Sequence, residues 1–592
     1  MNTTMKNTVK TGFCLGLVFY AGALVAATRT FQNAGGDLAS TDNADWNGPA
    51  PGSSDTATVD KAGTYTLSGD VEFNVLNVKD GGETFNFTGR TLKTTRENGE
   101  AIICAPSEGN PIVFNGGVIT NTTTSGRFYA TKNCSNGKTE INGGAKVYMA
   151  RLDVQNGTGT DNVLEISGGG NVFVSDYLYS DASGTDGGSY GGQTLRVSGL
   201  GSMLKYTGSK DISWGFRQSG NTLHVTDNAD FTSTASSKTF FLGSQSNANV
   251  TNNAVVVERS ATATIPKLVS RTDGNRIFVG DGAALTVPTL QLDSAANEVI
   301  VSNAAFNCST AFSLGNSAAS VGNVFRAIGP EVSLTLPVLE GMFANGYGNM
   351  FSIEGGIRWN KGVNTFCTNT HHCVFRVTGA GTVFGDASTF RNFFYFGSSE
   401  SGAPVTEACS NNSLEVLDGA VFNAARIALM GYDNALVVSN ATVRMAKSDD
   451  TIGMRVGFTK TGAPSSSGCM VRLCGTNPKI DINEQGSVTF ANNSILRFEI
   501  PKDGWVENHV AISTTGAFNF ESGCRLEIDC LKFARKGGRT FTLIEAGSEI
   551  SETVRANLQA NLNELPQGCT LVVDGRAVKL RCSRKGTVII VR

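Results

Sequence analysis

The sequence predicts an all-β fold, a right-handed parallel β-helix (a solenoid) with an N-terminal β cap and a C-terminal capping region. Three observations lead to this prediction: one short phrase recurs along the chain, its apolar residues alternate, and some copies lie only 22 residues apart, as between Asn253 and Asn275. The composition agrees, because 70 Gly against 13 Pro, with 17% charged residues, is typical of a turn-rich β protein.

The recurring phrase is clearest from Asn412 to Ala424, which reads NSLEVLDGAVFNA. Leu414 and Val416 are two residues apart, and an apolar period of two indicates a strand with one buried face. A turn and a second strand follow, and a third strand precedes the next copy. Copies begin at Asn162, Gln193, Asn221, Asn253, Asn275, Asn297, Asn323, Asn349, Cys373, Asn412, Asn434 and Cys469.

Three strands and three turns in so short a repeat indicate one coil of a parallel β-helix, which buries its apolar face by stacking on its neighbours. A propeller blade is excluded because it needs four strands and about 40 residues. Leucine-rich repeats need a helical return, whereas the return segments here, such as FFLGSQS from Phe240, are β-rich. Right-handedness is expected from the chirality of crossover connections.

The Asn that opens most copies is predicted to form a structural stack. A side-chain amide can both donate and accept hydrogen bonds, so a column of amides can satisfy backbone groups at the turns. A ligand site would not require so many copies. The predicted stack comprises Asn162, Asn221, Asn253, Asn275, Asn297, Asn323, Asn349, Asn412 and Asn434.

The N-terminus is predicted to be an export signal covering residues 1–27. Lys6 and Lys10 precede the apolar run GFCLGLVFYAGALVAA, and small residues precede Thr28. We therefore expect an exported bacterial protein, extracellular or at the cell surface, with the periplasm as the alternative.

Three further segments divide the mature chain. Residues 28–95 are expected to form the N-terminal β cap and the first coils, and residues 96–503 the β-helix repeats. Residues 504–592 are expected to form the C-terminal capping region. The recurring phrase is no longer recognisable there, and the one convincing helical stretch, ISETVRANLQANLNEL, lies in this region.

Charge and hydropathy exclude two classes of partner. Removal of the signal takes two of the 48 basic residues, which leaves 46 against 51 acidic residues, a formal charge of −5. Nucleic-acid-binding proteins carry a basic footprint, so no nucleic-acid partner is expected. No later segment approaches the roughly 18 apolar residues of a transmembrane helix, so no span is expected in the mature chain. Twelve cysteines remain, and the sequence leaves their pairing open.

Several motifs resemble the passenger repeats of bacterial autotransporter-like surface proteins. They are LRVSGLGSML from Leu195, FRVTGAGTVF from Phe375, WNGPAPGSSDTATV from Trp46 and RTFTLIEAG from Arg539. The resemblance implies a β-helix that is displayed outside the cell. One departure is that the sequence contains no C-terminal series of membrane β-barrel strands, and no sorting motif or hydrophobic anchor is seen, so self-translocation is not expected.

Catalytic motifs of β-helix enzymes are not recognised. A polygalacturonase-like enzyme would carry N-T-D, D-D, G-H-G and R-I-K, and the chain offers only the pair Asp449-Asp450. Adjacent residues on a strand point to opposite faces, so we interpret this pair as part of a solvated loop. No catalytic residue is assigned.

The segment CTNTHHC, from Cys367 to Cys373, is the one dense group of potential metal ligands. Zinc needs about four such ligands, the spacing matches no familiar pattern, and Cys373 occupies the Asn position of its copy. A disulfide or buried thiols is the favoured interpretation, and neither a metal site nor a cofactor is predicted.

The long Gly-rich interruption from Ser175 to Gly192 is the favoured place for ligand binding. Aromatic and acidic side chains together suit carbohydrate stacking or calcium, although no D-x-D-x-D-G pattern is present and a plain exposed loop is the alternative. The segment from Asn392 to Asn411 is interpreted in the same way. The candidate ligand-binding residues are Asp176, Tyr177, Tyr179, Asp181, Asp186 and Tyr190.

These observations favour a structural or adhesive rod that binds glycans or surface proteins through its side loops or lateral face. Two alternatives stay open: a polysaccharide lyase or glycoside hydrolase built on a β-helix, and a structural component of a surface layer.

Overall fold

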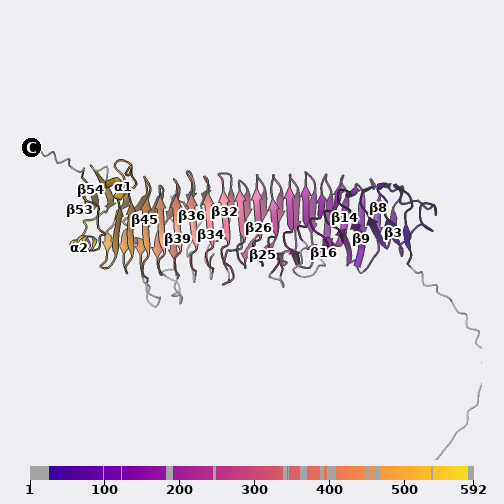
Figure 1. The fold of residues 1–592 in the computed structure, drawn as a ribbon, viewed down its shortest axis with the longest axis horizontal. Coiled ribbons are helices and arrows are strands. Elements are labelled where there is room, and N and C mark those ends of the chain that lie inside the picture. Colours follow the sequence, from indigo (N-terminus) through magenta and orange to yellow (C-terminus); the bar gives the residue numbers. More distant parts are fainter. Residues whose placement is uncertain are drawn as a thin grey trace, which may run out of the picture.

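The computed structural model describes residues 26–97, 99–121, 123–181, 191–244, 249–315, 317–337, 343, 346–360, 370–386, 393–396, 409–446, 452–458, 466–534 and 538–583. All but the last two residues of the predicted export signal lie outside these ranges. In the described ranges the chain is an all-β rod of stacked parallel strands, the arrangement of a β-helix solenoid, and Figure 1 shows it along its length. Successive coils contribute strands to three faces, which we call face 1, face 2 and face 3.

Face 1 is a ladder of 19 parallel strands, each paired with the corresponding strand of the coil before and after. In stacking order they are β2 (Gly36–Asp37), β4 (Gly63–Thr66), β7 (Glu83–Asn86), β10 (Ile112–Asn115), β13 (Lys138–Asn142), β15 (Val163–Ile166), β17 (Thr194–Ser198), β20 (Thr222–Thr226), β23 (Ala254–Val257), β26 (Arg276–Gly280), β29 (Glu298–Ser302), β32 (Val324–Ile328), β34 (Met350–Glu354), β36 (Val374–Thr378), β39 (Ser413–Leu417), β42 (Ala435–Ser439), β45 (Met470–Cys474), β48 (Ile495–Glu499) and β51 (Arg525–Asp529).

Face 2 collects the second strand of the coils. Its strands are β5 (Val71–Phe73), β8 (Thr91–Thr94), β11 (Val118–Asn121), the first halves of β14 (Lys146–Asn156) and β16 (Asn171–Asp181), β18 (Met203–Tyr206), β21 (Asp230–Ser233), β24 (Thr262–Thr264), β27 (Ala284–Thr286), β30 (Ala305–Asn307), β33 (Ser333–Thr335), β35 (Arg358–Trp359), β37 (Val383–Phe384), β40 (Val421–Ala424), β43 (Thr442–Ala446), β46 (Lys479–Asn483), β49 (Val510–Thr514) and β52 (Arg539–Glu545).

Face 3 collects the third strand. Its strands are β1 (Thr28–Thr30), β3 (Thr56–Val59), β6 (Val75–Lys79), β9 (Gly99–Ala105), β12 (Gly126–Lys132), the second halves of β14 and β16, β19 (Ile212–Trp214), β22 (Phe240–Leu242), β25 (Lys267–Ser270), β28 (Thr289–Leu292), β31 (Ala311–Ser313), β38 (Phe393–Phe396), β41 (Arg426–Leu429), β44 (Ile452–Val456), β47 (Ser487–Phe490) and β50 (Phe518–Phe520).

Face 1 accounts for the recurring phrase. Each of its twelve copies begins at the residue directly before a face 1 strand, from β15 to β45. The ladder extends further in both directions, from Gly36 to Asp529, so regular coils continue past residue 504, where we expected them to end. With 19 strands about 4.8 Å apart, the ladder is about 86 Å long.

The coil that contains NSLEVLDGAVFNA illustrates how the alternation builds the core. Leu414 and Val416 are fully buried, and burial of such side chains stabilises the fold by about 1.5–3 kcal/mol each. Glu415 lies on the outer surface, where it pairs with Arg376 of the preceding coil at 2.8 Å. The chain turns at Asp418-Gly419, with φ angles of 52° and 83°.

A ladder of side-chain amides runs along the corner where the chain enters face 1. The backbone N–H of Asn253 donates to Oδ1 of Asn275 at 2.9 Å, and that of Asn275 donates to Oδ1 of Asn297 at 2.9 Å. The corner residues linked in this way are Asn162, Gln193, Asn221, Asn253, Asn275, Asn297, Asn323 and Asn349 in one run, and Cys373, Asn412 and Asn434 in another.

Two cysteines take Asn positions in this ladder. The thiol of Cys373 donates to the Gly346 carbonyl at 3.9 Å, and the thiol of Cys469 donates to the Gly431 carbonyl at 3.4 Å. Burial raises the pKa of each thiol to about 12, so both stay protonated. Neither side chain offers an amide oxygen to the corner N–H of the preceding coil, so the amide ladder is interrupted at these two positions.

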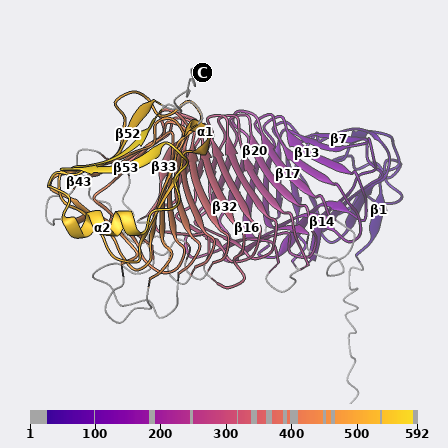
Figure 2. The ribbon, with the colours of Figure 1, turned by 60° about the vertical axis from the view of Figure 1, so that its left-hand side comes forward.

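The C-terminal segment leaves the regular stack after β51. It contains α1 (Leu531–Ala534), α2 (Glu552–Ala560) and a hairpin of β53 (Cys569–Asp574) and β54 (Ala577–Cys582), with β54 antiparallel to β52. Figure 2 shows α2 and β53 at this end of the rod. Within the described part of the chain, no helix has both the length and the apolar character needed to cross a membrane.

Candidate functional site

Two long strands distinguish the N-terminal third of the rod. In β14 and β16, which Figure 1 labels in the N-terminal part of the rod, the second and third strands of a coil merge into one strand. Each has 11 residues, and their pairing has a register irregularity between Met149 and Arg151. Neither segment shows the break that separates the second strand from the third in the other coils. Face 3 is therefore extended here.

The outward positions of β12, β14 and β16 come into register across three coils. One row contains Arg127, Arg151 and Tyr177, and the next contains Tyr129, Asp153 and Tyr179. We call these six residues the tyrosine–arginine patch. It includes two of the residues that we expected to bind a ligand, Tyr177 and Tyr179.

Aromatic rings and cations are interleaved in the patch. The rings of Tyr177 and Tyr179 stack with centroids 5.3 Å apart, and the Arg151 guanidinium lies 4.5 Å from the Tyr177 centroid. Arg151 also donates from Nε to Asp176 at 3.1 Å, and Arg127 donates to the Tyr129 hydroxyl at 3.1 Å. These contacts hold the long arginine side chains in place against the rings.

The neighbouring coils extend the patch on two sides. Phe216 lies 5.9 Å from the Tyr179 ring, and the Lys210 ammonium lies 5.9 Å from the Tyr177 ring. Towards face 2, the rings of Tyr148 and Phe173 stack at 4.6 Å with an interplanar angle of 6°, and Tyr148 is 40% exposed. Flat aromatic surfaces and positive charges thus follow one another along the outside of these coils.

Asp153 lies at the centre of the patch and is nearly inaccessible, with 2% of its surface exposed. Among the described residues, no hydrogen-bond donor reaches its Oδ1 atom. Burial raises the pKa of Asp153 to about 7, against the opposing effect of Arg127 and Arg151. A buried carboxyl that changes charge near neutral pH is a common feature of functional sites.

Asp181 has a structural position rather than an exposed one. It accepts hydrogen bonds from the backbone N–H groups of Phe216 and Arg217, both at 2.9 Å, and from the Ser180 hydroxyl at 2.7 Å. Burial raises its pKa to about 6 despite these bonds. Its role in the structure is to hold the following coil.

The interruption from Ser175 to Gly192 is therefore shorter than expected, because β16 continues to Asp181. Asp176, Tyr177 and Tyr179 lie on this strand instead of a loop. Two further predicted ligand residues, Asp186 and Tyr190, lie outside the described residues.

The other predicted segments give no convergent site in the described ranges. Asp449, Asp450 and Cys367 lie outside them. His371 bonds to the Ser410 hydroxyl at 2.7 Å, and the His372 ring packs against Tyr347 with centroids 4.9 Å apart.

The segment from Asn392 to Asn411 is described in part. The side chains of Phe394 and Phe396 are buried in the core. These aromatic residues therefore belong to the scaffold.

The sequence reasoning did not identify Arg127, Tyr129, Arg151 and Asp153. The sequence feature that could have pointed to them is the alternation of inward and outward residues in GRFYATK and ARLDVQN. Alternation alone does not say which outward residues of different coils become neighbours.

One group of potential metal ligands is present in the described ranges. Cys530, Cys569 and Cys582 lie at the C-terminal end of the rod, with their sulfur atoms within 4.8 Å of one another. The sequence reasoning did not predict this group.

Comparison of the chain with protein-family models, with curated proteins and with solved structures finds no match.

Proposed function

We propose that this chain is an exported bacterial surface or extracellular rod, related to autotransporter passengers, that adheres to an acidic glycan through the tyrosine–arginine patch. The export signal and the passenger-like motifs of the sequence support the location. The patch supports the binding activity, and it is the observation on which the function rests.

The proposal includes a right-handed coil and capped ends. Right-handed connections are the rule when parallel strands are joined through a crossover. At the N-terminal end, the buried rings of Phe31 and Trp46 lie 4.9 Å apart over the first coils. At the other end, the proposed cap consists of α2, which contacts β50, and the β53–β54 hairpin, whose strand β54 pairs with β52. Such covers protect the strand edges that would otherwise promote aggregation.

The chemistry of the patch fits a polymer of acidic sugars. The C–H face of a sugar ring packs on a tyrosine ring, and the hydroxyl of the tyrosine remains available for a hydrogen bond. Arg151 and Lys210 beside these rings supply charges that complement a carboxylate or sulfate group. Because the residues repeat along the coil stack, the patch can contact successive sugars of one chain.

Binding to a panel of uronate-containing, sulfated and neutral oligosaccharides tests the proposal. We expect the acidic members to bind, and Tyr177→Ala and Arg151→Ala each to weaken binding by roughly tenfold, since one such contact contributes about 1–2 kcal/mol. Arg276→Ala is the matched control, because Arg276 packs 5.3 Å from the Phe278 ring outside the patch. Equal loss in the control, or preference for neutral sugars, would contradict the proposal.

A second candidate function is a polysaccharide lyase or glycoside hydrolase. The observation in its favour is Asp153, a carboxyl with a pKa of about 7 between two arginines and two tyrosines, which suits proton transfer near neutral pH. Turnover of an acidic polysaccharide that Asp153→Asn abolishes while glycan affinity is retained would establish this function. Binding without turnover would leave adhesion as the activity.

A further inference from the structure

Three cysteines from separate elements meet at the C-terminal end of the rod. Cys530 lies between β51 and α1, Cys569 begins β53, and Cys582 ends β54. Their sulfur atoms lie within 4.8 Å of one another, and the residues are 0%, 8% and 3% exposed. Cys530 and Cys569 are 39 positions apart in the sequence, and Cys569 and Cys582 are 13 positions apart. We call this buried group of three residues the thiol cluster.

Backbone geometry brings two of these thiols together. Cys569 lies opposite Cys582 in the antiparallel hairpin. The Ser583 N–H donates to the Gly568 carbonyl at 2.7 Å, so the cysteine pair occupies a non-hydrogen-bonded site, where facing side chains approach most closely. Their sulfur atoms are 2.8 Å apart.

The third thiol converges on this pair from a different element. The sulfur of Cys530 lies within 4.8 Å of both other sulfur atoms, and the residue is fully buried. A disulfide would need only two of these cysteines. The convergence of a third buried thiol therefore calls for a different occupant.

We propose that the thiol cluster binds one thiophilic d10 metal ion, Zn(II) or Cu(I), through three thiolates. Soft sulfur ligands select these ions over Mg2+ or Ca2+, which prefer oxygen. With a metal–sulfur distance of about 2.3 Å, tetrahedral ligands lie about 3.8 Å apart, which is within the span of this cluster. Entry of the ion separates Cys569 and Cys582 by about 1 Å and releases the thiol protons to solvent.

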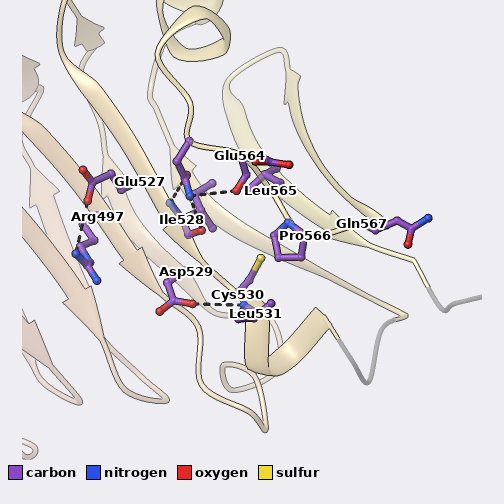
Figure 3. Close-up of a pocket in the computed structure, with 11 residues that line it drawn as sticks. Arg497, Glu527, Ile528, Asp529, Cys530, Leu531, Glu564, Leu565, Pro566 and Gln567 are labelled. Carbon is purple, nitrogen blue, oxygen red and sulfur yellow. Dashed lines mark hydrogen bonds and ion pairs between the residues drawn. The ribbon is translucent and has the colours of Figure 1, made fainter.

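A cavity adjoins the cluster at Cys530 and offers a route for the ion. It has a volume of about 560 Å³, opens to solvent, and is lined in part by Cys530, Asp529, Glu564 and Pro566 (Figure 3). Acidic side chains at its wall attract cations. Water in this cavity can provide a fourth ligand for Zn(II), whereas Cu(I) is satisfied by three sulfurs.

Metal binding would link the end of the rod to the terminal hairpin, because one ligand directly follows the last face 1 strand and the other two come from the two strands of the hairpin. An ion that binds only the folded arrangement stabilises it by mass action. This inference does not depend on the proposed glycan binding, so each can fail without the other.

Metal titration of the full-length reduced protein tests the proposal. We expect one Zn(II) or one Cu(I) per chain at the thiol cluster, measured in separate arms, with a thiolate-to-metal charge-transfer band when Co(II) replaces zinc and a rise in melting temperature. Cys530→Ser should weaken binding by about 100-fold or more, since even partners outside the ligand set typically change affinity 10–100-fold. The matched control is Cys308→Ser, a fully buried cysteine in a middle coil, which should bind as the wild type does.

Three results would overturn the proposal. The first is metal binding that Cys530→Ser leaves unchanged, and the second is no metal binding at all by the folded reduced chain. The third is a Cys569–Cys582 disulfide in protein isolated without reductant, found by mass spectrometry of unreduced peptides, with Cys530 as a free thiol. Because Cys530→Ser keeps the size of the side chain, its circular dichroism should match the wild type, which separates loss of the site from loss of the fold.

Discussion

Replacement of Asn275 by alanine removes one amide from the middle of the ladder. Oδ1 of Asn275 accepts the backbone N–H of Asn253, and its Nδ2 donates to the Thr272 carbonyl at 2.6 Å and to the Ser270 hydroxyl at 2.9 Å. All of these groups are buried. The substitution therefore leaves a backbone donor and two acceptors without their partner in the interior.

The expected loss can be worked from these bonds. A buried backbone donor left unpaired costs about 1–3 kcal/mol, and each of the two lost donations about 1 kcal/mol. The sum is about 3–5 kcal/mol in the free energy of unfolding. In a solenoid each coil contacts only its neighbours, so the loss should be concentrated in the coils around β26.

Hydrogen exchange by mass spectrometry is the suitable assay, because a long repeat array does not unfold in one step. We expect the amide of Asn253 and its adjacent coils to exchange much faster in Asn275→Ala, and thermal unfolding to begin at lower temperature. Asn307→Ala, at an exposed position of β30, is the control and should change stability by less than about 0.5 kcal/mol. Unchanged protection at Asn253 would refute the view that the ladder stabilises the stack.

Two further predictions concern the ladder and the patch. Cys373→Asn supplies an amide oxygen at the corner where the run of amides ends at Asn349. It should raise the unfolding free energy by about 0.5–1.5 kcal/mol in a denaturant titration, whereas a decrease would indicate that the larger side chain does not fit. The pKa of Asp153 is about 7 in the folded chain and near 3.9 in the unfolded chain. Between pH 4 and 7 the folded state therefore binds a proton that the unfolded state has released. The free energy of unfolding should fall as pH rises through this range, by at most about 4 kcal/mol. Asp153→Asn should flatten this slope in thermal melts from pH 4 to 8, and an unaltered slope would count against the raised pKa.

The repeat itself could be predicted from the sequence because local alternation and stacking agree. Leu414 and Val416 had to face the core, and a polar residue that recurs at each corner had to find a partner in the next coil. The end of the regular stack was less predictable. The segment that contains β51 lacks the recurring phrase, yet β51 pairs with β48. The strand geometry and the backbone hydrogen bonds between coils do not depend on the phrase.

The candidate site was predictable only in part. Tyr177 and Tyr179 were recognisable as unusual aromatic residues near an interruption, but their neighbours are Arg151 and Asp153, which belong to an earlier coil. Coil lengths vary, so the separation between stacked residues changes from coil to coil. The register across coils is a tertiary property, and alternation within one strand does not contain it.

Both candidate sites lie where the coil departs from its regular form, and there is a physical reason for this. In regular coils each corner amide oxygen accepts the backbone N–H of the corner residue in the preceding coil, as Oδ1 of Asn275 does with the N–H of Asn253, which leaves this atom with little capacity for a ligand. Where β14 and β16 merge two strands into one, outward side chains meet without such a repeating partner, and the Oδ1 of Asp153 has no donor among the described residues. At the C-terminal end, where α1 and the terminal hairpin follow the last face 1 strand, three buried thiols converge. Binding capacity in a solenoid is therefore expected at the interruptions, and substitutions there should change ligand binding with less effect on the stack than substitutions in the amide ladder.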